Sequence, residues 1–162
     1  EILKDITILK KFDFINIPLS PVGEQNAPQS DDPSDDPNDA ADRQLDLVGQ
    51  QKLMVMLGSG SGDIFIFDRE RYKQFAKQGA FMSLDDKLDQ IPGLTSDKDK
   101  LNDLKVKAED EKDAHVFGVP IDDVTLFEGT GYDAKNKVMS IMSYSKKPDK
   151  AFDVFKWILS KR

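Results

Sequence analysis

The feature that most constrains the fold is residues 58–68, GSGSGDIFIFD, where a glycine-rich loop joins a helical segment to an apolar strand. A phosphate-binding loop needs the order strand, loop, helix, because the amides of the helix N-terminus then point at the anion. Here the order is helix, loop, strand, and no Gly-Lys-Ser/Thr follows. We therefore interpret Gly58 to Gly62 as a connection that uses the tolerance of glycine for positive φ, with Gly58 as the C′ residue of the helix.

Helical and apolar extended segments alternate along the chain. This pattern predicts the α/β class, in one compact domain with a central mixed sheet flanked by helices. The predicted helices cover 39–57, 69–79, 96–104 and 147–162, and the predicted strands cover 12–17, 63–67, two short segments around the acidic turn 109–113, and 137–145. In the first helix, Asp39 is the expected N-cap, and the residues expected to face the core are Leu45, Val48, Leu53 and Met56.

The 162 residues suffice for a single domain, 1–162, with a real core. One segment departs from the rest: no Lys or Arg occurs from Phe12 to Asp42, and five of the eight prolines fall there. Residues 20–38 have almost no apolar side chain with which to offset the entropy of ordering. We expect these residues to form a mobile acidic loop rich in Pro and Asp.

Charge and composition exclude several classes of partner and site. A net charge of −7 repels nucleic-acid phosphates and anionic lipid head groups. No apolar run approaches the ~20 residues that span a bilayer. The absence of cysteine excludes disulfides, thiolate metal sites and a cysteine nucleophile. We expect no nucleic-acid partner and no cofactor.

Six aspartates between Asp31 and Asp42 raise the alternative of calcium binding, because Ca²⁺ takes oxygen ligands. An EF-hand loop needs Gly at its sixth position and Glu at its twelfth, and the segment supplies neither at that spacing. A solvated acidic loop explains the composition more simply. We therefore predict no specific metal site.

The sequence carries no recognisable catalytic set. His115 is the only histidine, and a single histidine within a strand favours a packed or edge residue over a general base. The pairs Asp85–Asp86 and Asp122–Asp123 are adjacent in sequence and do not face each other, and Asp85–Asp86 more simply caps a short helix. No G-x-S-x-G is present. The chain is therefore predicted to be non-enzymatic.

Three segments carry a family resemblance. AKQGAFMSLDD (76–86), HVFGVP (115–120) and SKKPDKAFDVFKWIL (145–159) resemble successive motifs of the extracellular solute-binding proteins of ABC importers. That family has two lobes with the ligand between them, whereas only some sixteen residues separate Pro120 from the strand at Lys137. The resemblance implies one lobe of a periplasmic-binding-protein fold, on an extracytoplasmic, cell-surface or membrane-anchored protein such as a lipoprotein, whose anchor lies outside this sequence.

In open α/β sheets, ligands bind beyond the carboxyl ends of the strands. The strand 63–67 delivers Asp68 and Arg69 to that edge with Tyr72 one helical turn along, and the strand ending at Pro120 delivers Asp122 and Asp123. The resemblance places first-lobe ligand contacts of solute-binding proteins at comparable loops. These five residues are the predicted ligand-binding residues.

Two functions remain open from the sequence. The first is a non-enzymatic binding module that takes a small-molecule solute of unknown identity at this edge. The second is a membrane-tethered interaction or structural domain that uses the same scaffold to bind a cell-envelope protein. A polar pocket at the strand ends would favour the first function and a flat apolar patch the second. In either case, we expect a monomer.

Overall fold

The computed structural model describes residue 17, residues 37–94 and residues 98–162. The predicted strand at 12–16 and the predicted acidic loop up to residue 36 lie outside the described residues. The helices are α2 (Pro37–Ser59), α3 (Arg69–Lys77), α4 (Lys98–Asn102) and α5 (Pro148–Leu159), with 3₁₀ turns η3 (Asp85–Gln90) and η4 (Thr125–Phe127). The strands are β1 (Ile64–Asp68), β2 (Lys105–Lys107), β3 (Ala114–Val116), β4 (Gly118–Pro120) and β5 (Lys137–Ile141).

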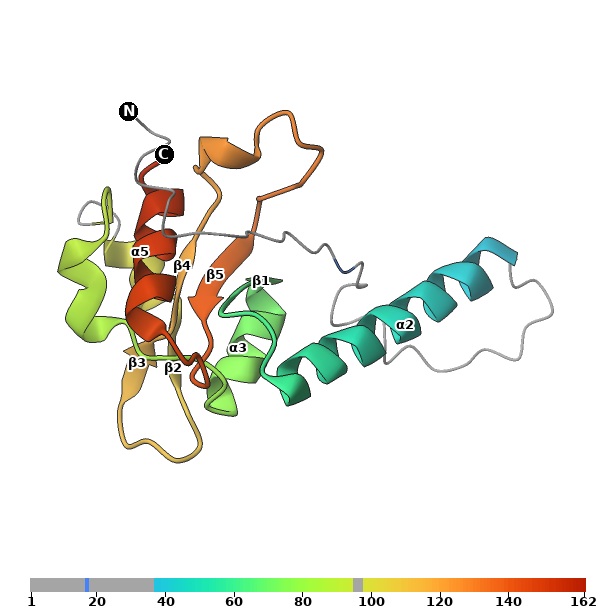
Figure 1. Ribbon diagram of the computed structural model, residues 1–162, viewed down its shortest axis with the longest axis horizontal. Helices are drawn as coiled ribbons and strands as arrows, with labels where there is room; N and C mark the ends of the chain where they lie inside the picture. The colour runs from blue at the N-terminus through green and yellow to red at the C-terminus, as the bar shows by residue number, and fades with distance from the viewer. Residues whose placement is uncertain (1–16, 18–36, 95–97) are drawn as a thin grey trace.

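The α/β class and the single domain are confirmed, and two small sheets provide the strands (Figure 1). The main sheet has the order β1-β5-β4, and β2 pairs with β3 as a hairpin around the acidic turn. Every pairing among the described strands is antiparallel, where a mixed sheet was expected. The reason is that no crossover helix separates β4 from β5, and parallel neighbours need such a crossover. Since β1 and β4 both run antiparallel to β5, these two outer strands share one direction.

The main sheet lies between two apolar layers, because side chains alternate between its faces. On one face, Met139 and Ile141 of β5 pack with Phe152, Phe155 and other apolar residues of α5. The opposite face packs against α3 and the end of α2, and its core residues are Leu53, Phe67, Tyr72, Ala76, Phe81, Val138 and Met142. The predicted inward face of α5 is confirmed, with Ala151, Phe155, Ile158 and Leu159 all buried.

The glycine-rich connection between α2 and β1 has the predicted order, but the helix ends later than expected. Gly58 lies within α2, and Gly60, with φ of 65°, is the left-handed residue that ends it. The Gly60 amide donates to Leu57 O and the Ser61 amide donates to Met56 O, the pair of bonds that defines a Schellman C-cap. At its other end, α2 begins at Pro37, two residues before the expected N-cap.

Gly118 of β4 has less space around it than any other described glycine. A Cβ atom at this position would lie 2.5 Å from Ser140 Oγ, 2.6 Å from Val138 Cγ1 and 2.8 Å from Tyr72 Cε2. Ser140 is its cross-strand partner in β5, and the Tyr72 ring belongs to α3. The missing side chain therefore allows β4 and α3 to approach β5 together.

We predict that Gly118→Ala destabilises the domain, because the added methyl group must displace backbone-anchored neighbours. Overpacking of this kind typically costs about 1–3 kcal/mol. The matched control is Gly58→Ala, since a Cβ there meets no atom within 4 Å and the residue is helical. Urea denaturation should show a lower midpoint for the first variant and an unchanged or raised midpoint for the control. Equal midpoints for Gly118→Ala and the wild type would contradict the observed β4–β5 register.

Candidate functional site

The two strand ends that were predicted to form a ligand edge do meet at one end of the sheet. Asp68 pairs with Lys137 at the start of β5, and Pro120 pairs with the next residue, Val138. Asp122 follows β4 directly and accepts a hydrogen bond from the Asn136 amide at 2.7 Å. We call this end, formed by Asp68, Arg69, Asp122, Asp123 and Tyr132, the strand-end rim.

Asp68 is held by its own helix. Its Oδ1 accepts the Arg71 amide at 2.8 Å as the N-cap of α3, as predicted, and its Oδ2 lies 3.1 Å from Arg71 Nη1. Its charge also acts on Tyr132: burial is the main cause that raises the pKa of this phenol, with Asp133 and Asp68 adding to the effect. Arg69 is half-buried, and its Nε has no hydrogen-bond partner among the described residues.

Asp122 and Asp123 are engaged in structural contacts as well. The Asp122 carboxylate stabilises Asn136, which has φ of 56° and therefore a left-handed backbone. Asp123 Oδ1 lies 3.3 Å from Arg162 Nε, and Arg162 Nη2 donates to Pro120 O at 2.9 Å. Sequence reasoning missed Asn136 and Arg162, because their contacts join segments distant in the chain. The three aspartates of the rim thus fasten helix α3 and two loops.

Tyr72 does not lie at the rim, where it was expected. Its side chain is fully buried, and its ring stacks on Phe81 at 5.8 Å between centroids. The hydroxyl donates to Leu104 O at 2.6 Å and accepts from the Phe117 amide at 3.2 Å. Burial raises the pKa of Tyr72 to about 12. Tyr72 belongs to the helix that follows β1, as predicted. Its side chain, however, points to the inner side of α3 and joins that helix to the segments around β2 and β3.

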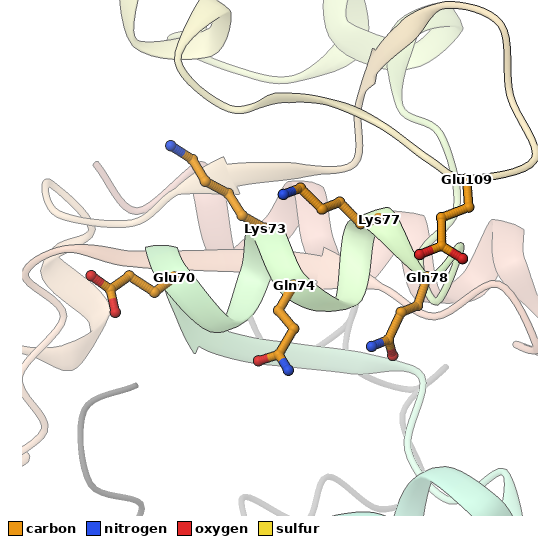
Figure 2. A pocket seen from close by; sticks show the side chains of 6 residues that line it. All are labelled: Glu70, Lys73, Gln74, Lys77, Gln78 and Glu109. Atoms are coloured by element: carbon orange, nitrogen blue, oxygen red, sulfur yellow. The ribbon is translucent and has the colours of Figure 1, made fainter. Parts of the chain in front are cut away.

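Two surface hollows among the described residues lie away from the strand-end rim. One, of about 430 Å³, lies along α3 and is lined by Glu70, Lys73, Gln74, Lys77, Gln78 and Glu109. Figure 2 shows that these side chains spread apart and do not converge on a common point. The other, of about 270 Å³, lies between η3, α4 and β3 and is lined mainly by apolar side chains and by Asp89 and Lys105.

His115 forms the closest contact between titratable side chains at the surface of the described chain. Its Nδ1 lies 2.5 Å from Asp85 Oδ2, and its Nε2 lies 3.8 Å from Glu111 Oε2. Asp85 Oδ1 also accepts the Val116 amide at 3.2 Å. Asp85 was expected to cap a short helix, but no side-chain cap is present at η3, and this carboxylate instead joins the first residue of η3 to β3.

The hydrogen bond to Asp85 raises the pKa of His115 above its ordinary value of 6.5. Partial burial opposes this effect, and the charges of Asp85, Glu111 and Asp113 reinforce it. We call the His115–Asp85 pair the histidine clasp. Its side chains are about one-third exposed, at 34% and 35%, so solvent screens the pair. The geometry is that of a link between two segments, consistent with the edge position expected for His115.

Helix α2 exposes apolar side chains on the side away from the core. Leu53 is buried, whereas Leu47, Val48, Met54 and Val55 are 58%, 57%, 66% and 70% exposed. Val48 was expected to face the core together with Leu53, and this expectation is wrong. At 100° per residue, Val55 and Val48 point about 160° and 140° away from Leu53, and Leu47 and Met54 point about 120° and 100° away from it. In Figure 1, α2 projects away from the sheets. We call these four residues the apolar stripe.

In the part of the chain that the structure describes, no cluster of three or more His, Asp or Glu side chains is placed to hold a metal ion. Within the same residues, no helix combines the length and the apolar character needed to cross a bilayer.

No family model, no curated protein and no solved structure matches this chain. The resemblance to solute-binding proteins therefore stays a prediction from three sequence segments.

We predict that the histidine clasp stabilises the domain at low pH and not at high pH. A pKa that is raised in the folded state means that folding favours the protonated imidazole. The contribution is therefore fully present below the unfolded value of 6.5 and is lost as pH rises through the raised folded value. Asp85→Asn should return the histidine pKa, measured by NMR, toward 6.5.

The matched control is Asp86→Asn, because Asp86 is exposed and is not among the groups that shift the pKa of His115. Thermal unfolding should show a stability gap between wild type and Asp85→Asn that narrows from pH 5.5 to pH 8.5, in steps of about one pH unit. A gap that is constant over this range would show that His115 does not titrate in the clasp.

Proposed function

We propose that this chain is a non-enzymatic protein-interaction domain, in which an α/β lobe serves as scaffold and the apolar stripe of α2 forms the contact surface. The observation that carries the proposal is the exposure of four large apolar side chains on one side of a helix whose opposite side is packed. Contiguous exposed apolar surface on a soluble domain indicates a contact with another protein or with a membrane.

Charge favours a protein over a membrane as the partner. The net charge is −7, and six of the aspartates that contribute to it lie between Asp31 and Asp42, in the segment that precedes the stripe. Anionic lipid surfaces repel such a chain. The partner should therefore present a complementary apolar helix face. An extracytoplasmic, membrane-tethered location is part of the proposal and rests on the family resemblance alone.

The rival function is a solute site at the strand-end rim. It is favoured by the gathering of Asp68, Arg69 and Asp122 at one end of the sheet, and by the unpartnered Nε of Arg69. It is disfavoured by the contacts that already engage the carboxylates. A ligand site normally encloses most of its ligand, and a rim on a single lobe provides no opposing wall.

We predict that the rim does not bind small solutes. Two-dimensional NMR spectra of the ¹⁵N-labelled chain would be recorded with a panel of sugars, amino acids and short peptides. Titration to about 10 mM detects binding as weak as millimolar. The expected result is no saturable set of shifts around Asp68 and Asp122. Saturable shifts there that disappear in Asp122→Asn would overturn the proposal, since this variant keeps the acceptor for Asn136 and removes only the charge.

A further inference from the structure

The apolar stripe is symmetric about Gln51. Leu47 and Val55 lie four residues before and after Gln51, and Val48 and Met54 lie three residues before and after it. All five positions are exposed and fall on the same side of α2. The stripe runs for about 12 Å along the helix, at 1.5 Å per residue. A surface with this spacing has the same pattern when the helix is turned end for end.

Such symmetry is what an isologous contact requires. In a two-fold dimer the same patch is used by both copies, so each residue i that meets j has a matching j that meets i. An antiparallel pair of α2 helices centred on Gln51 would place Val48 of one copy against Val55 of the other, because these two residues lie on the same side of Gln51 around the helix. It would likewise place Leu47 against Met54, so that every apolar side chain of the stripe has an apolar neighbour.

The residues at the centre and at the end of the stripe fit the same arrangement. A glutamine side chain has both a donor and an acceptor, so two Gln51 side chains facing each other can form a hydrogen bond. A polar pair at the centre of an apolar helix contact sets its register. One turn beyond Val55, Gly58 is exposed and has no side chain, so that the partner helix can approach closely.

From these observations we propose that the partner of the apolar stripe is a second copy of this chain, bound through antiparallel pairing of the two α2 helices. This inference rests on the proposed interaction function and identifies its partner. It differs from the monomer expected from the sequence. The contact is short, and two copies with a charge of −7 repel each other. The dimer is therefore weak and is strengthened by salt that screens this repulsion.

Sedimentation equilibrium of the whole chain tests the proposal. The expected result is a reversible dimer with a dissociation constant of about 10 μM to 1 mM in 0.15 M salt, at the weak end of specific interfaces. Val55→Glu places a carboxylate against Val48 of the other copy and should abolish the dimer. Gln74→Glu changes the charge equally on the exposed side of α3 and should leave the dimer intact. Circular dichroism confirms that both variants are folded.

Disulfide trapping tests the antiparallel register, since the chain has no cysteine of its own. Gln51→Cys places one thiol near the two-fold axis and should cross-link readily under mild oxidation. Met54→Cys places the two thiols six residues apart along the helices, about 9 Å, and should cross-link poorly. Gln74→Cys reports random collision between copies.

Several results would overturn the dimer. One is a chain that stays monomeric at 1 mM. The proposal also fails if hydrogen exchange shows that the stripe of such a monomer is already protected within a single copy. A dimer that survives Val55→Glu, or equal trapping at positions 51 and 54, would also overturn it. The solute titration is independent of these measurements. If the chain is monomeric and no solute shifts the strand-end rim, only the second copy is rejected as the partner. If a solute gives saturable shifts at the rim, the interaction function itself is rejected.

Discussion

The close approach of α3, β4 and β5 is the constraint on which the rest of the described fold depends. Gly118 has no side chain, so the Tyr72 ring and the Ser140 side chain can occupy the space beside it. The buried Tyr72 hydroxyl then joins Leu104 O and the Phe117 amide, which connects α3 to the segments that carry the β2–β3 hairpin and β4. Loss of the close approach, or of the Tyr72 hydroxyl itself, would leave the Leu104 carbonyl and the Phe117 amide without this partner. Each unpaired buried group costs about 1–3 kcal/mol.

The strand-end rim shows how one arrangement of charges can suggest a site and still serve the fold. Asp68 caps α3, Asp122 supports the left-handed backbone of Asn136, and Asp123 pairs with Arg162. Each carboxylate accepts a hydrogen bond from a backbone amide or pairs with a nearby cation, so each contributes to local stability. A ligand at the rim would have to compete with these contacts. Among the described residues, the side chains of the apolar stripe stay exposed, which is why we favour the interaction function.

The strand-end rim and the apolar stripe both result from the small size of the main sheet. Three strands are covered on one face by α5 and on the other by α3 with the end of α2. The second layer uses only one side of α2, around Leu53, and the projecting helix keeps its other apolar side exposed. The histidine clasp acts locally, between the first residue of η3 and β3, and is separate from both surfaces in the described elements.

Local sequence determined which segments are helix and strand. The apolar run 64–67, the cap at Asp68, the hairpin around 109–113 and the buried face of α5 depend on neighbouring residues, and all were predictable. Tertiary structure decided the antiparallel order β1-β5-β4, the burial of Tyr72 and the exposure of Val48. Periodicity shows that a helix has an apolar side, but it cannot show which of two apolar sides finds a core. That choice is made by contacts between segments far apart in the chain, and the same long-range contacts recruit Asn136 and Arg162 to the rim.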